Sequence, residues 1–138
     1  MLRTLTSGLE LDDDPRRVDV AAVHAFLSIE SYWARARTAA TVQRLVHEAS
    51  RVVGLYDGLR QIGFARVVSD GVAIAYLADV YVLGPWRGRG LGFELVREAV
   101  ERGPHRDLRW ILHTADGHAF YEKFGFEPPS DRLLVRNP

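Results

Sequence analysis

The sequence contains no cysteine, no long apolar run and no excess of charge of either sign. Without cysteine the chain can form no disulfide bond, no thiolate metal site and no cysteine-acyl intermediate. No stretch approaches the roughly 18 apolar residues of a membrane span, so we expect a soluble, cytoplasmic protein without a membrane partner. Its 18 basic and 18 acidic residues cancel, so we expect no nucleic acid partner. Partners must be inferred from local sites.

Length and composition fit one folded domain. The 138 residues are 47% hydrophobic, which is ample for a single core, and domains commonly run about 100 to 150 residues. There is no internal repeat and no low-complexity segment. We therefore expect residues 1–138 to form one domain.

Several acidic and histidine residues could suggest a metal ion, but their spacing does not. Residues 12–14 lack the glycine and distal glutamate of a calcium loop. His113 and His118 lie five positions apart with no helix to align them, and His47 is followed by Arg51 where a zinc motif needs a second histidine. We expect no metal site.

Helical spacing of apolar residues predicts two helices in the first part of the chain. Asp19 and Thr38 are suitable N-caps for them. Their buried stripes are expected at Val20, Val23, Phe26 and Leu27, and at Val42, Leu45, Val46 and Ala49. The arginines at 35, 37, 44 and 51 are expected to form a solvated face.

The remaining apolar segments predict strands with a helix between the last two central ones. Strands are expected at residues 51–56, 61–68, 72–82 and 109–113, with short ones within 1–11 and at 133–135. A helix over 91–100 and a short one over 116–123 complete the set. The strand, helix and strand from 79 to 113 predict a parallel crossover, whose first loop lies where open α/β sheets commonly hold ligands.

That first loop, residues 87–92, is rich in glycine and arginine. The first N–H groups of the following helix are unpaired and face the loop, where the helix dipole adds partial positive charge. Glycines let a ligand approach the backbone, and Arg87 and Arg89 supply donors for phosphate oxygens. Phe93 stands where a dinucleotide fingerprint needs its third glycine. The loop predicts a phosphate-bearing ligand; the alternative is a solvated loop with two surface arginines.

Two motifs together resemble a known family. Residues 87–92, RGRGLG, fit Arg/Gln-x-x-Gly-x-Gly/Ala, and residues 121–126, YEKFGF, follow about thirty positions later. Both are similar to motifs of the GNAT superfamily of N-acetyltransferases, in the same order. The resemblance covers nearly the whole chain. It implies an α/β (α+β) fold with a mixed, mostly antiparallel central sheet of about six to seven strands, helices on both faces and a splay between strands 4 and 5.

The resemblance also implies acetyl-CoA as the co-substrate and places it on the chain. It assigns the pantetheine arm to Val80, Tyr81 and Val82, and the pyrophosphate to Arg87, Gly88, Arg89, Gly90, Leu91 and Gly92. Tyr121 matches the general acid that protonates the departing thiolate. Thr114 occupies a position where many members have an asparagine that contacts pantetheine, so this chain departs from the pattern there. The family further implies a homodimer.

Three residues are candidates for the acceptor side of the site. Asp79 is the only charge in a long apolar strand, so it is either a paired structural carboxylate or the general base for the acceptor. Some family members use a glutamate of the same strand as base, but Asp79 lies at a different register. Tyr32 and Trp33, in the connection between the first two helices, either line the acceptor site or cover the edge of the core.

The predicted reaction is transfer of acetyl from acetyl-CoA to a primary amine of a small molecule or peptide. Because the chain has no cysteine, we expect direct attack within a ternary complex unless a serine or threonine serves as nucleophile. Two alternatives remain open. A non-catalytic acyl-CoA-binding or sensor domain would keep the loop of residues 87–92 without needing Tyr121. A plain interaction module would not bind coenzyme A.

Overall fold

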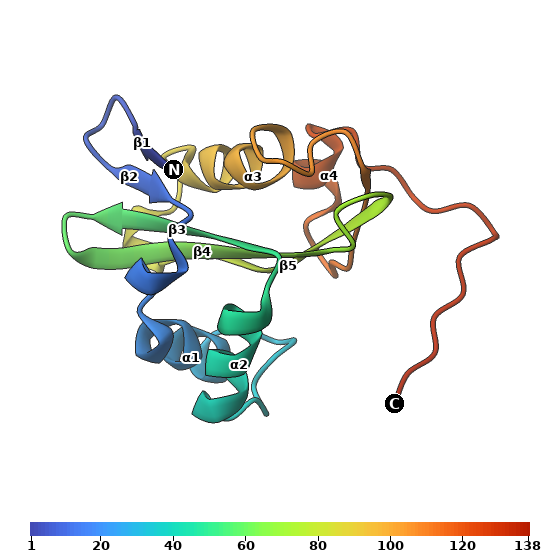
Figure 1. Cartoon of the computed structure of the whole chain (residues 1–138), viewed down its shortest axis with the longest axis horizontal. Helices are drawn as coiled ribbons and strands as arrows, with labels where there is room; N and C mark the ends of the chain where they lie inside the picture. The colour runs from blue at the N-terminus through green and yellow to red at the C-terminus, as the bar shows by residue number, and fades with distance from the viewer.

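Six strands form a single sheet that carries helices on both faces in the computed structural model, which describes residues 1–138 (Figure 1). The strands are β1 (Leu2–Thr4), β2 (Glu10–Asp12), β3 (Arg51–Asp57), β4 (Arg60–Ser69), β5 (Ile74–Val82) and β6 (Arg109–Leu112). The helices are α1 (Val20–Ile29), α2 (Ala39–Glu48), α3 (Leu91–Glu101) and α4 (His118–Glu122), with 3-10 turns at η1 (Pro15–Arg17) and η2 (Gly84–Trp86). This confirms the expected mixed α+β class.

The strands lie in the sheet in the same order as in the sequence. All neighbours are antiparallel except β5 and β6, which α3 connects in parallel, as predicted. Residues 1–12 form two short strands, where the sequence predicted one, because the chain turns back at Gly8 with a left-handed φ of 86°. The predicted strands 4 and 5 are therefore β5 and β6.

The sheet splays between β5 and β6. Their pairing covers only Ile74–Leu77 and Arg109–Leu112, whereas β5 continues to Val82. Residues 78–82 consequently have no strand beside them on that edge. The predicted splay is confirmed, and it opens a gap in the sheet after Leu77.

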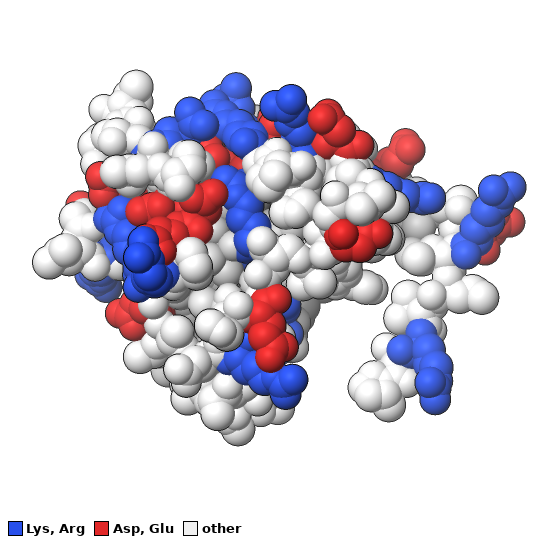
Figure 2. All heavy atoms as spheres, viewed as in Figure 1, with Lys and Arg blue, Asp and Glu red and all other residues white.

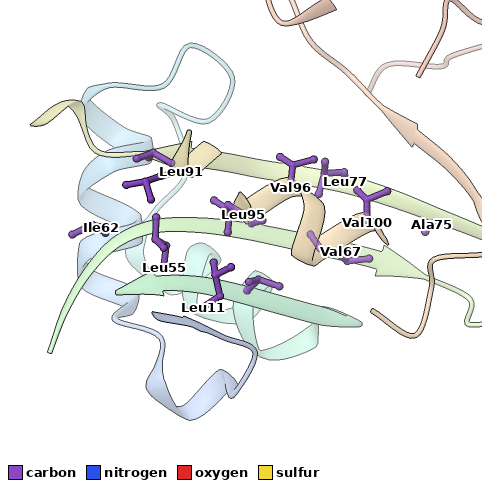
Figure 3. Packing of buried hydrophobic residues seen from close by; sticks show 14 residues of the cluster. Leu11, Leu55, Ile62, Val67, Ala75, Leu77, Leu91, Leu95, Val96 and Val100 are labelled. Carbon is purple, nitrogen blue, oxygen red and sulfur yellow. The ribbon is translucent and has the colours of Figure 1, made fainter. Parts of the chain in front are cut away.

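Two apolar layers hold the helices to the sheet. On one face, α3 packs Leu91, Leu95 and Val96 against Leu55 and Leu77 of the strands (Figure 3). On the other face, α1 and α2 cover a second cluster, which comprises Val23, Phe26, Leu27, Val42, Val46, Val52, Phe64 and Tyr81 among others. The predicted N-caps are present: the side chain of Asp19 accepts from the N–H of Ala22, and that of Thr38 accepts from the N–H of Thr41.

A β-bulge in β5 reverses the direction of its side chains. Phe64 pairs with Tyr81 and Arg66 with Ala78, so the two residues Asp79 and Val80 lie opposite Ala65 alone. Asp79 has a φ of 54° and is the only non-glycine residue with a positive φ. Leu77 therefore packs under α3, while Tyr81 packs under α1 and α2.

Two predictions about residues at the margins of the fold are wrong. Residues 133–135 form no strand: the chain after Phe126 leaves the sheet, and Leu134 is 91% exposed (Figure 1). Two prolines at 128 and 129 remove N–H donors, and three apolar residues bury too little to stay on the sheet. Arg51 is buried rather than solvated, because β3 begins there beneath α3, where its guanidinium pairs with Glu98.

Charges of both signs are interspersed over the face of the molecule shown in Figure 2, and neither sign covers it. This agrees with the net charge of zero. No helix is both long enough and apolar enough to cross a bilayer. No cluster of three or more histidine or acidic side chains is placed to hold a metal ion.

Candidate active site

The main cavity of the protein lies at the splay between β5 and β6 and has a volume of about 970 Å³. Most of its wall comes from five segments: residues 76–82 of β5, the end of β6 with the loop that follows, residues 87–93, α4, and the connection between α1 and α2. Phe26 of α1 and Arg66 of β4 complete the wall. Thirteen of the fourteen predicted site residues line it, and Arg89 is the exception. Arg89 turns away and donates to the carbonyl of Pro85.

The glycine loop presents bare backbone to one end of this cavity. Gly88 and Gly90 have φ values of 79° and 74°, and Gly90 is the N-cap of α3 without a side-chain hydrogen bond. The first N–H groups of α3 therefore have no side-chain partner, unlike those of α1 and α2. Arg87 lies beside them, with its Nε donating to the carbonyl of Val82 at 2.9 Å. This arrangement suits an anion with several oxygens.

Tyr121 lies in the wall of the same cavity, on α4. Burial raises the pKa of Tyr121 to about 12, and the nearby Tyr32 and Asp116 add to the effect. The phenol is therefore protonated at neutral pH. Its ring fits closely over Gly117, where an added Cβ would lie 3.0 Å from a ring carbon.

Thr114 sets the start of α4. Its Oγ1 accepts a hydrogen bond from the N–H of Gly117 at 2.9 Å. Thr114 lines the cavity, and its hydroxyl proton makes no hydrogen bond within the chain. The predicted pantetheine contact of Thr114 stays a prediction.

Asp79 is held by three side chains at the bulge of β5. Its carboxylate accepts from Trp33 Nε1 at 2.9 Å, from Arg66 Nε at 2.8 Å and, with both oxygens, from Arg37 Nη1 at 2.8 and 2.9 Å. Burial alone would raise the pKa of Asp79. The charge and hydrogen bond of Arg66, together with Trp33 and Arg37, outweigh burial and hold this pKa below its ordinary value.

The connection between α1 and α2 crosses the cavity as a strap, here defined as residues 31–37. At one side Trp33 and Arg37 bind Asp79 on β5. At the other, the hydroxyl of Tyr32 accepts a hydrogen bond from the N–H of Ala115, in the loop after β6, at 3.0 Å. Tyr32 and Trp33 also contact each other edge to face at 5.0 Å. The strap therefore bridges the two strands that part at the splay.

Comparison with known proteins identifies the fold and the family. Residues 11–126 match the family model described as the acetyltransferase (GNAT) family. The chain belongs to the GNAT family of acetyltransferases. Like other GNAT proteins it is an acyltransferase, and the family uses acetyl-CoA.

Individual GNAT relatives agree over most of their length. A Gibberella zeae protein assigned as an acetyltransferase is 27% identical in an alignment 135 positions long, which covers 83% of this chain and 76% of that protein. A crystal structure of a GNAT protein from Xanthomonas campestris pv. campestris is 34% identical, with a TM-score of 0.89 over 94% of this chain and 93% of that one. An acetyltransferase structure from Clostridium acetobutylicum, determined with acetyl-CoA, is 15% identical and shares the fold, with a TM-score of 0.67 over 93% and 96% of the two chains.

Four residues of this GNAT site were missed by sequence reasoning. Arg37 and Arg66 bind Asp79, and the Tyr76 hydroxyl contacts Nδ1 of His113 at the cavity wall. A usable signal existed for Arg66. It is a charge inside an apolar strand that is expected to pair with the strand of Asp79, and two opposite charges on adjacent central strands favour an ion pair. No comparable signal marks Tyr76 or His113. The expectation that Arg37 lies on a solvated face is wrong, because it pairs with Asp79 in the cavity wall and its side chain is only 28% exposed.

Proposed function

We propose that this GNAT protein transfers the acetyl group of acetyl-CoA directly to a primary amine in a ternary complex. The observation that carries the proposal is the single cavity at the splay. It joins the uncapped start of α3, the free edge of β5 and the protonated phenol of Tyr121. The start of α3 would bind the anionic tail of acetyl-CoA, the free edge of β5 would bind its extended amide-bearing arm, and the phenol would protonate its leaving thiolate.

The cavity suits acetyl-CoA along its length. The N–H groups at the start of α3 and the guanidinium of Arg87 would bind the pyrophosphate. Residues 80–82, in the part of β5 that β6 does not cover, would pair their backbone with the pantetheine amides. Arg89, which lies outside the cavity lining, would serve the phosphates only from the rim. The Clostridium acetobutylicum structure with acetyl-CoA supports the same ligand for this fold.

The chemistry requires one proton to leave the amine and one to reach the sulfur. The neutral amine nitrogen forms a bond to the thioester carbonyl carbon, and the carbon–sulfur bond then breaks with its electron pair on sulfur. A backbone N–H at the end of β5 would stabilise the oxyanion of the tetrahedral intermediate. Tyr121 would give its proton to the thiolate. The products are the acetylated amine and free coenzyme A.

We assign the base to His113 and a holding role to Asp79. An alkylamine has a pKa of roughly 10.4, so it arrives protonated and needs a base. Asp79 is a poor base, because three side chains already occupy its oxygens and its pKa is lowered. His113 lines the cavity with Nδ1 against the Tyr76 hydroxyl, and its Nε2 makes no hydrogen bond within the chain. Tyr76 would orient the ring.

Two measurements on the unmodified protein test the proposal. Calorimetric titration with coenzyme A should show binding at one site per chain. A thiol-release assay with acetyl-CoA and a panel of amines should then show amine-dependent turnover. Binding without turnover on any amine would identify a sensor domain, and no binding would identify an interaction module. Either result would refute the proposed enzyme.

A further inference from the structure

We propose that the amine acceptor carries a carboxylate, which Arg66 and Arg37 bind at the bulge of β5. This inference rests on the proposed function and specifies the class of its acceptor. It assigns to the two arginines a role in recognition, in addition to their contacts with Asp79.

The charges at the bulge do not balance. Arg66 and Arg37 both bind Asp79, so two positive groups share one negative group and one positive charge remains in excess. All three lie in the cavity wall, and the Arg66 and Asp79 side chains are only 11% and 3% exposed. An excess charge in such a place is weakly screened by water and favours an anionic partner.

The two guanidinium groups also have unused donors. Arg66 uses only its Nε within the chain, and Arg37 uses only its Nη1. The only buried side-chain atoms without a hydrogen bond are Tyr56 Oη and His105 Nδ1, so the free nitrogens of Arg66 are open to the cavity rather than enclosed. The paired terminal nitrogens of a guanidinium match the two oxygens of a carboxylate.

Other charges in the cavity do not cancel this excess. Glu30 and Asp116 also line the cavity but are exposed at its rim, where solvent and salt screen them. The basic residues Arg87 and Lys123 belong to the end formed by the glycine loop and α4. Arg66 and Arg37 at the bulge thus provide the buried positive charge at the end of the cavity where the proposed acceptor would bind.

The position of Asp79 along β5 limits the distance between the acceptor's carboxylate and its reacting nitrogen. Asp79 immediately precedes residues 80–82, which the proposed function assigns to the pantetheine arm. A carboxylate on Arg66 would therefore lie only a few bonds from an amine that attacks the thioester. Amino acids have this spacing between the two groups, and long polyamines have no carboxylate to place.

The first test compares amino acids with their carboxamides as acceptors for the unmodified protein. The amide keeps the shape and the amine but removes the negative charge, and its amine is the more easily deprotonated. Loss of a charge-assisted pair should lower kcat/KM for the amide by about tenfold to hundredfold. Equal or faster turnover of the amides would overturn the inference and leave the proposed acetyl transfer intact. Turnover of neither would count against the proposed function itself.

The second test uses Arg66→Lys, which keeps a positive charge beside Asp79 but removes the planar fork. We expect KM for the amino acid to rise about tenfold, with KM for its amide unchanged and kcat affected little. Arg44→Gln, on the exposed face of α2, is the matched control and should change neither value. If Arg66→Lys weakened both acceptors equally in a protein that melts like the unmodified one, the role of Arg66 would be structural and the inference would fail.

Discussion

The hydroxyl of Tyr32 accepts a hydrogen bond from the backbone N–H of Ala115, although the two residues are 83 positions apart in the chain. This contact ties the strap to the loop that follows β6, while Trp33 and Arg37 tie it to β5. The strap thus lies across the side of the cavity where the proposed acceptor would bind, with bonds to β5 and to the loop after β6. Its two attachments can be tested separately.

Tyr32→Phe removes the attachment at Ala115 and keeps the ring against Trp33. A neutral hydrogen bond contributes about 0.5 to 1.5 kcal/mol, so we expect KM for the acceptor to rise about two- to tenfold. The dissociation constant of coenzyme A, measured by calorimetry, should not change, because the strap faces the acceptor. Weakened coenzyme A binding with an unaltered acceptor KM would show that the strap belongs to the other end of the cavity.

Tyr121→Phe should lower kcat by about 10² to 10³, because the thiolate then leaves without a proton from the phenol. Coenzyme A binding should persist. The matched control is Tyr56→Phe, on β3 away from the cavity, whose hydroxyl is buried without a partner. That control should keep full activity and be stabilised by up to about 1 kcal/mol, since an unsatisfied hydroxyl is removed. Full turnover by Tyr121→Phe would require another acid.

Asp79→Asn should lower the free energy of unfolding by about 3 kcal/mol, because it leaves Arg66 and Arg37 without their shared carboxylate. The folded pKa of Asp79 is lowered, so its contribution is present above the unfolded pKa of roughly 3.9 and is lost as the pH falls through the folded value. Denaturant titrations should therefore show a large difference in the free energy of unfolding between the variant and the unmodified protein at neutral pH. This difference should shrink at acidic pH. A fully stable but inactive variant would instead support Asp79 as the base.

His113→Gln tests the assignment of the base. Replacing the imidazole with an amide of similar reach should lower kcat/KM by about 10² at neutral pH. The loss should shrink as the pH rises, since the acceptor amine then loses its proton without help. His118→Gln, on the exposed end of α4, is the control and should show no such effect. An unchanged pH profile in His113→Gln would remove His113 from the mechanism.

Alkaline pH should destabilise the fold through its buried tyrosines. Burial raises the pKa of Tyr56 and of Tyr121 to about 12, and it raises the pKa of Tyr81 as well. Between the unfolded value of roughly 10 and these folded values, the unfolded chain binds fewer protons, so the free energy of unfolding falls as the pH rises. Denaturant midpoints measured from about pH 8 to about pH 11 should decline more steeply for the unmodified protein than for Tyr56→Phe.

Sequence patterns predicted the elements well where local chemistry determines them. The N-caps Asp19 and Thr38 and the glycine loop of residues 87–92 depend on a few neighbouring residues, and they form as expected. Residues 133–135 have the composition of a strand, but a strand also needs a partner, which composition does not show. The connections along the chain did predict the parallel pairing of β5 with β6, but composition alone does not show whether an isolated segment finds a partner strand.

The acceptor side of the site depends on contacts between distant segments. Arg37 and Asp79 are 42 positions apart, and their ion pair needs both the strap and the bulge of β5. The bulge has no glycine to mark it: Asp79 takes a left-handed backbone conformation, which aspartate tolerates but adopts less often than glycine does. The charge of Asp79 was noticed in the sequence, but its partners followed only from the structure.

Because β5 contains one extra residue at its bulge, the fold should tolerate residue exchanges in this strand better than a change in its length. Deleting one residue at 79 or 80 would restore regular alternation, and every side chain downstream would change sides. Tyr81 would then turn from Phe26 towards the helix on the opposite layer, and the loop of residues 87–92 would be drawn back by about 3.3 Å. Natural variation in this segment should therefore consist of exchanges that conserve its length, while insertions accumulate in the tail after residue 126.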